Sequence, residues 1–358
     1  MVIARGAYRA IRLRRFRDGF AVPDIHFEPD GHYVEITTAP FEYSNPPVTF
    51  TRSAHERAAV DDLERDIAEL IESVVEKLSD YRLRNTWLQD RWSLIQASLE
   101  DAEERFFCES AGALGIDPYL CKETEVEAIE AAAEFFDDEP LLEFLASQRG
   151  QQPRSALAWL QAADAQLGDK AAMPTIAELA YGADALKSPP DARALRASQP
   201  WELGYRLAED CRRALGLNPE RVFDDIADVA ALFGGTRFQV AAGRVHGLRA
   251  EVVVNSAPKI IVADLRAPQS RTFAMMRAIG DFLAFRQEGR SPVTDTYSYR
   301  QRIGRAFAVE MLAPAEIILQ MERDGLVPDE IAATRNVSEV AITRHLENRH
   351  ALQDVAAG

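Results

Sequence analysis

The chain has 358 residues, a hydrophobic fraction of 47%, an aromatic fraction of 8% and a net charge of −16. This composition is typical of a folded globular protein, and the length suffices for two or three domains that each bury a core. No apolar run approaches the length of a bilayer-crossing helix, and three scattered cysteines without CxxC spacing argue against a disulfide framework or a structural zinc motif. We therefore expect a cytoplasmic protein with no cofactor and no membrane association.

The first 53 residues have the pattern of short strands. Runs such as HYVEITTAPFEY have strand-like composition and are broken by glycine and proline. Near the beginning of the chain, Ile11 and Leu13 alternate with arginines, which indicates a half-exposed edge strand. The Arg-rich, acid-poor start also resembles a transit peptide, but the alternation favours the strand. We expect residues 1–53 to form a β-rich segment.

Residues 54–186 are predicted to form a helical, acidic domain. Leu63, Ile67 and Leu70 recur at spacings of three and four, which predicts an amphipathic helix. Residues 100–150 contain fifteen acidic side chains against three basic ones. Such a surface repels phosphate and disfavours nucleic acid as a partner. It fits a solvated helical face, or a surface that receives a basic partner or mimics nucleic acid.

The prolines and small residues of KSPPDARALRASQP predict a linker at residues 187–200, which separates the helical domain from residues 201–358. Two helices are expected after the linker, followed by three β-rich runs, TRFQVA, LRAEVVVN and KIIVADL. Their lengths and their Val and Ile content predict a small antiparallel sheet, packed against a helix at residues 271–285. The expected fold class is therefore α+β and mostly helical.

The helix RTFAMMRAIGDFLAF and the later run RAFAVEMLAP carry the apolar frame of two motifs of a known family. They resemble the R-x-F-T-x-A-H-E-x-G-H and E-x-x-A-N-x-F-A-x-x-L-L-x-P motifs of the ImmA/IrrE metallopeptidases, over about residues 201–350. The residues that keep the scaffold of the two motifs are Arg271, Phe273, Ile279, Gly280, Phe307, Ala308, Met311, Leu312 and Pro314. The resemblance implies a zincin-like domain, in which two histidines and an acidic residue on the second helix would hold zinc.

The residues that would bind zinc are absent from both motifs. Arg277, Ala278 and Asp281 stand where the family has its first histidine, its glutamate and its second histidine. Gln301 or Ile303 stands where the acidic third ligand is expected, and that stretch of the helix has no acidic residue. An arginine cannot replace a histidine here, because its guanidinium stays protonated. We expect no metal site and no proteolytic activity.

The substituted positions allow two interpretations. In the first, Arg277 and Asp281 share a helix face at i,i+4 spacing and form an ion pair that fills the space of the metal. In the second, arginines and tyrosines line the old cleft and bind phosphate or carboxylate, with a ring that stacks on a base or a peptide side chain. The residues of such a cleft are Arg277, Arg300, Arg302, Arg305, Tyr297 and Tyr299. An exposed basic helix face is the simpler alternative for the later arginines.

Near the C-terminus, IAATRNVSEVAITRHLEN has the pattern of a helix-turn-helix. Asn336 falls in the turn, and Ser338 is predicted to cap the second helix. If this unit binds DNA, Ser338, Thr343 and Arg344 are the expected contacts with the major groove. From residue 324 to the end, six acidic residues oppose three arginines, which favours helices that only pack behind the domain, as the family resemblance also implies.

Three functional hypotheses follow from these patterns. The favoured one is a proteolytically inactive ImmA/IrrE-like regulatory or interaction protein with a protein partner. The family implies a setting in a phage-defence, prophage or toxin–antitoxin locus. The second hypothesis is an enzyme or toxin that acts on nucleotide, nucleic acid or peptide through the arginine-lined cleft. The third is a helix-turn-helix regulator that binds DNA.

Overall fold

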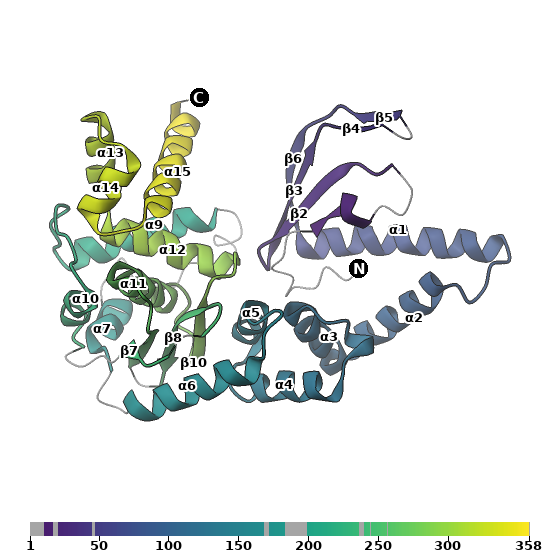
Figure 1. Cartoon of the computed structure of the whole chain (residues 1–358), viewed down its shortest axis with the longest axis horizontal. Helices are drawn as coiled ribbons and strands as arrows, with labels where there is room; N and C mark the ends of the chain where they lie inside the picture. The colour runs from purple at the N-terminus through teal and green to yellow at the C-terminus, as the bar shows by residue number, and fades with distance from the viewer. Residues whose placement is uncertain are drawn as a thin grey trace. The chain divides into compact units, whose positions relative to one another are not determined.

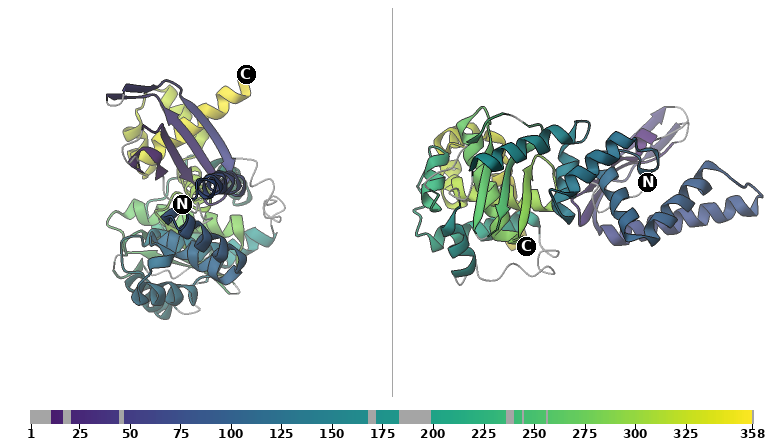
Figure 2. Two further views of the ribbon diagram at one scale, coloured as in Figure 1. Left: turned by 90° about the vertical axis from the view of Figure 1, so that its right-hand side faces the viewer. Right: turned by 90° about the horizontal axis from the view of Figure 1, so that it is seen from below.

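The computed structural model describes residues 11–16, 21–44, 47–167, 172–182, 199–235, 240–243, 245–255 and 257–357. The chain divides into an N-terminal unit, residues 1–130 with 141–150, and a C-terminal unit, residues 131–140 with 151–358. Its described residues form a mixed α and β structure that is mostly helical, with small sheets (Figures 1 and 2). Within these residues, every helix is too short or too polar to span a bilayer.

The N-terminal unit contains a four-stranded antiparallel sheet in the order β1-β2-β3-β6. Its strands are β1 (Ile11–Arg12), β2 (Asp24–Pro29), β3 (Tyr33–Ala39) and β6 (Ala54–Ala59); β4 (Phe41–Ser44) and β5 (Pro47–Phe50) form a separate hairpin. β1 is an edge strand, as its alternating pattern predicts. It is shorter than predicted, because the 3-10 helix η1 (Leu13–Phe16) follows directly.

The strands of this unit extend beyond the predicted boundary at residue 54. The sequence there predicts a helix, but β6 pairs with β3 and is held by charges across the two strands. His55 Nε2 lies 2.8 Å from Glu35 Oε2, and Arg57 Nε lies 3.4 Å from Glu35 Oε1. Helix α1 (Val60–Asp80) begins only after this strand, and Val60 is buried with Val34 of the sheet.

The acidic segment is helical, as its pattern predicts. Its elements are α2 (Trp87–Glu100), α3 (Ala102–Leu114), η2 (Pro118–Leu120), α4 (Glu123–Ala133) and α5 (Asp138–Ser147). Side-chain caps fix where the helices begin: Thr86 and Gln89 form a capping box at α2, and Asp101 accepts two backbone N–H groups at the start of α3. The end of α4 and the beginning of α5 belong to the C-terminal unit.

A four-stranded sheet in the order β10-β8-β9-β7 lies at the centre of the C-terminal unit. β8 (Leu248–Val254) pairs antiparallel with β9 (Pro258–Ala263) and with β10 (Gly289–Thr294), whereas β7 (Val240–Ala241) is parallel to β9. The sequence predicts β8 and β9 correctly. The parallel pairing of β7 corrects the prediction of a purely antiparallel sheet.

Strand β10 is missing from the sequence-based prediction. Its sequence, GRSPVT, contains Pro292, which would interrupt the hydrogen bonds of a central strand. The proline is tolerated because β10 is an edge strand of the sheet. Residues 236–239, the beginning of the run predicted as the first strand, lie outside the described residues.

Nine further helices are described in this unit: α6 (Pro153–Leu167), α7 (Pro174–Gly182), α9 (Pro200–Ala214), α10 (Ile226–Leu232), α11 (Pro268–Phe285), α12 (Tyr299–Leu312), α13 (Ala315–Arg323), α14 (Pro328–Arg335) and α15 (Glu339–Ala357). Helix α11 packs against β8 and β9 as well as against α12, and a single hydrophobic core joins these elements with α7, α9 and α10 (Figure 1).

Helices α6 and α7 correct the predicted domain division. The sequence places them in the helical domain at residues 54–186, but they belong to the C-terminal unit. Met173 and Ile176 are part of its core, and the Trp159 indole N–H donates to the Ala242 carbonyl at 2.8 Å. Most of the predicted linker, residues 187–198, lies outside the described residues, and α9 begins at Pro200.

Two glycines allow three helices to meet closely. A Cβ on Gly204 of α9 would lie 2.6 Å from Ala306 Cβ and 2.9 Å from the Phe307 backbone nitrogen, and would also meet the Ile303 carbonyl. A Cβ on Gly280 of α11 would lie 2.6 Å from the Phe307 ring. The Phe307 side of α12 therefore packs where neither neighbouring helix carries a side chain.

We expect Gly204→Ala to destabilise the C-terminal unit by about 2 to 3 kcal/mol, because overpacking against the α12 backbone outweighs the gain of about 1 kcal/mol in helix propensity. Gly112→Ala is the matched control: Gly112 also lies in a helix, and an added Cβ would meet nothing within 4 Å. Urea unfolding followed by circular dichroism measures both changes. A Gly204→Ala protein as stable as the wild type would contradict the close packing.

Candidate functional site

Helix α11 contains the predicted zinc-helix positions. Pro268 lies in its first turn, where a missing N–H leaves no helical hydrogen bond unmade, and Arg286 ends the helix in the left-handed conformation at φ 49°. Arg277, Ala278 and Asp281 are all buried, and none of them is more than 4% exposed. The three substituted positions therefore lie inside the unit, where polar groups need partners.

Asp281 is the partner of Arg300 on α12. Arg300 Nε and Nη2 donate to the two carboxylate oxygens of Asp281 at 2.5 and 2.7 Å. The same guanidinium donates to Gln287 Oε1 and to Ser291 Oγ, both at 2.8 Å. This pairing corrects the predicted i,i+4 bridge between Arg277 and Asp281, since a fork from the neighbouring helix offers two parallel hydrogen bonds at once.

Arg277 contacts Gln301, one of the two positions where the acidic third ligand is expected. Its Nη2 donates to Gln301 Oε1 at 2.7 Å and also to the Thr294 carbonyl. The Gln301 amide in turn accepts from the Thr294 N–H at 3.0 Å and donates to the Pro292 carbonyl at 2.8 Å. The Gln301 side chain thus makes the two hydrogen bonds that the backbone of a neighbouring strand would make with β10.

The buried groups around Arg277 do not resemble a metal site. A guanidinium is always protonated and donates only, and an amide is a weak ligand. Among the residues that the structure describes, no three His, Cys, Asp or Glu side chains gather as metal ligands would. A groove of about 300 Å³ beside Arg277 is also lined by Arg305 and by a bidentate pair between Arg249 and Asp295. Its charges suit an anion better than a cation.

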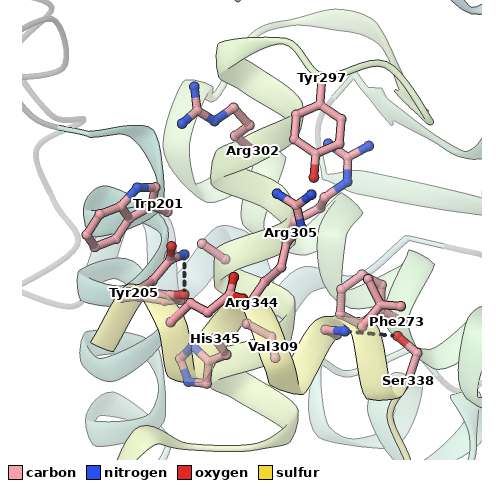
Figure 3. Close-up of a pocket in the computed structure, with 15 residues that line it drawn as sticks. Trp201, Tyr205, Phe273, Tyr297, Arg302, Arg305, Val309, Ser338, Arg344 and His345 are labelled. Atoms are coloured by element: carbon pink, nitrogen blue, oxygen red, sulfur yellow. Dashed lines mark hydrogen bonds between the residues drawn. The ribbon is translucent and has the colours of Figure 1, made fainter. Parts of the chain in front are cut away.

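A second groove, of about 400 Å³, lies between α9, α11, α12 and α15 (Figure 3). We call it the arginine groove and define it by its lining residues: Trp201, Tyr205, Phe273, Tyr297, Arg302, Arg305, Ala306, Val309, Ser338, Val340, Ala341, Arg344, His345, Glu347 and Asn348. It shares Phe273, Arg305 and Ser338 with the groove beside Arg277, so the two grooves are adjacent.

The predicted cleft residues separate into two groups. Tyr297, Arg302 and Arg305 line the arginine groove, as the anion-binding interpretation requires. Tyr299 and Arg300 are only 2% exposed and do not line it, which corrects their assignment. The reason is geometric: two residues along a helix turn the side chain by about 200°, so Arg300 and Arg302 point to opposite sides of α12.

Tyr297 is the aromatic centre of the arginine groove and is 49% exposed. The guanidinium carbons of Arg305 and Arg344 lie 4.9 and 5.3 Å from its ring centroid, within the range of cation–π contacts. Arg305 is further fixed by a hydrogen bond of 2.8 Å from Nη2 to the Thr296 carbonyl. Tyr297 therefore brings together arginines from two helices that are far apart in the sequence.

Helices α14 and α15 form the predicted helix-turn-helix. Asn336 adopts the left-handed conformation at φ 53° in the turn, and the Ser338 hydroxyl caps α15 by accepting the Ala341 N–H at 3.3 Å. Of the predicted DNA contacts, Thr343 donates its hydroxyl hydrogen to the Glu339 carbonyl of its own helix, and Arg344 lies over Tyr297. Of the three predicted DNA contacts, Ser338 and Arg344 line the arginine groove and Thr343 does not.

A buried charged cluster fastens α15 to α9 and α12, and sequence reasoning did not find it. His345 Nε2 lies 3.0 Å from Glu310 Oε2, and Arg349 Nη2 lies 2.8 Å from the same oxygen and 2.8 Å from Glu209. Burial lowers the pKa of His345. Burial alone would raise the pKa of Glu310, but His345 and Arg349 hold it below its usual value. The signal in the sequence is one acid in the apolar run AVEML.

Comparisons with protein-family models, with curated proteins and with solved structures gave no match to this chain.

Proposed function

We propose that the C-terminal unit is a degenerate ImmA/IrrE-like, zincin-type domain that does not hydrolyse peptides and acts by binding. The protein would be a cytoplasmic bacterial regulatory or interaction protein with a protein partner, within a phage-defence, prophage or toxin–antitoxin locus. The family resemblance supplies this setting, and the residues of α11 and α12 supply the argument against hydrolysis.

One observation carries the proposal: the positions that the resemblance assigns to the first and third ligands are in contact, but through an arginine and an amide. The distance from Arg277 Nη2 to Gln301 Oε1 is 2.7 Å, where Gln301 is one of the two positions, with Ile303, that could correspond to the third ligand. The two helices therefore meet where a shared metal ion would hold them. Asp281, at the second ligand position, is already bound by both donors of the Arg300 fork. Asp281 and Gln301 thus have hydrogen-bond partners without a metal ion.

Zinc content of the purified chain tests this proposal. The chain is equilibrated with zinc chloride and dialysed, and its zinc content is measured by mass spectrometry. We expect far less than one zinc per chain, because Arg277 and Gln301 offer no anionic or imidazole donor and the Asp281 carboxylate is already paired with Arg300. Stoichiometric zinc that survives dialysis, and that is lost in Asp281→Asn, would contradict the proposal. Asp295→Asn, at an exposed carboxylate, is the matched control for non-specific binding.

A further inference from the structure

The arginine groove combines positive charge with aromatic surface. Its charged lining consists mainly of Arg302, Arg305 and Arg344, and its rings are those of Trp201, Tyr205, Phe273, Tyr297 and His345. Among the described residues that line it, Glu347 alone is acidic. Three arginines against one acid give the groove a local excess of positive charge, a reversal of the sign of the chain as a whole, whose net charge is −16. Such a reversal concentrates anions at this place.

The arginines are held in position before any ligand arrives. Arg305 and Arg344 lie against one ring, that of Tyr297, and Arg305 is also hydrogen-bonded to the backbone. Arg302, the third arginine, also lines the groove, and Figure 3 shows its guanidinium pointing away from Tyr297. Guanidinium groups that are already ordered lose little entropy when they bind a phosphate by paired hydrogen bonds.

The rings offer stacking surfaces of the size of a base. Trp201 and Phe273 lie on opposite sides of the groove (Figure 3), and the Tyr297 ring is half exposed although Arg305 and Arg344 cover part of it. Stacking of a base on an aromatic ring contributes about 1 to 3 kcal/mol and does not depend on the sequence of the ligand. A volume of about 400 Å³ lies in the range typical of small-molecule sites and suits one nucleotide.

An extended peptide is a poorer fit to the same region. Peptides that bind along a sheet pair with the backbone of an edge strand, and β10 is an edge strand of the sheet in this unit. Its Thr294 N–H and Pro292 carbonyl are already taken by the Gln301 amide, and its Thr294 carbonyl accepts from Arg277. The backbone groups that would recognise a peptide chain are therefore occupied from within.

We infer that the arginine groove binds a nucleotide unit, with its phosphate between the guanidiniums of Arg302, Arg305 and Arg344 and its base against the aromatic rings. A free nucleotide and a single strand of nucleic acid present the same chemistry. The inference rests on the proposed function, since it treats the C-terminal unit as a binding protein and involves no bond that forms or breaks.

Calorimetric titration of the full chain tests the inference with three probes: adenosine 5′-monophosphate, a short single-stranded oligothymidylate and a hexaglutamate peptide. We expect saturable binding of the nucleotide, the strand or both. Arg344→Gln and Tyr297→Leu should each weaken it by about tenfold or more, since each removes a charge-assisted contact or a stacking surface. Both side chains are exposed, so both variants should stay folded. Arg323→Gln, an exposed arginine of α13, is the control and should leave the affinity unchanged.

The probes also identify the source of the ligand. A strand that binds far more tightly than the monophosphate, with an affinity that falls steeply with salt, indicates nucleic acid; equal affinities per site indicate a free nucleotide. The inference is overturned if neither nucleotide probe binds, if only hexaglutamate binds, or if Arg344→Gln and Tyr297→Leu bind as well as the wild type. Zinc is measured on the same sample: bound zinc overturns the proposed function alone, and absent nucleotide binding overturns this inference alone.

Discussion

Asp281→Ala is expected to lower the free energy of unfolding of the C-terminal unit by about 3 to 5 kcal/mol, the usual effect of breaking a buried ion pair. Arg300 is 2% exposed and loses both of its carboxylate contacts in this variant. Gln287 and Ser291 still accept hydrogen bonds from it, but these neutral groups do not balance a buried positive charge.

Two further variants separate the loss of charge balance from the loss of packing. Asp281→Leu combined with Arg300→Met should lie within about 1 kcal/mol of the wild type, because apolar side chains of similar volume often replace a buried pair without loss. Asp295→Asn breaks the exposed pair with Arg249 and should change the stability by less than about 1 kcal/mol. Urea unfolding measures all three. An Asp281→Ala protein no less stable than Asp295→Asn would show that the buried pair is not formed.

A second large effect is expected from Glu251, which makes stability depend on pH. Glu251 is fully buried on β8, with Arg290 Nη1 at 3.1 Å. Burial, partly offset by Arg290, raises its pKa from 4.5 to about 7. Between these pH values the native chain keeps a proton that the unfolded chain has released, so stability falls as the pH rises through this window and then levels off. The fall from this group amounts to about 3 kcal/mol.

Glu251→Gln should remove this fall, because an amide does not titrate and can still accept a hydrogen bond from Arg290. The melting temperatures of Glu251→Gln and the wild type, measured from pH 5 to pH 8, should therefore diverge. The variant should become progressively more stable than the wild type as the pH rises. Glu288→Gln, at an exposed carboxylate near the same strand, is the control and should follow the wild-type curve. Parallel curves for Glu251→Gln and wild type would contradict a raised pKa.

The helices of the C-terminal unit could be read from the sequence because their signals are local. The apolar spacing of α11 and α12, the proline at the start of α9 and the Ser338 cap of α15 all act within a few residues. β6 and β10 could not be read in this way. Their stability comes from pairing with β3 and β8, and the residues that pair are distant in the sequence.

The same distinction applies to the candidate site. Spacing along one helix suggests a bridge between Arg277 and Asp281, but the partner of Asp281 comes from α12, nineteen residues further on. Helical periodicity does separate Arg300 from Arg302, yet it cannot say which of the two faces a groove. The spacing of the sequence does not group Arg344 with Arg302 and Arg305. In the structure α15 lies beside Tyr297, so that all three arginines line one groove.

The amide of Gln301 also limits how copies of this protein can assemble. Many proteins associate by continuing a sheet from one subunit into the next, which requires free backbone donors and acceptors along an outer strand. At β10 those groups at Pro292 and Thr294 already have an intramolecular partner. A sheet that continues from Pro292 and Thr294 into another subunit would therefore first have to displace the Gln301 amide.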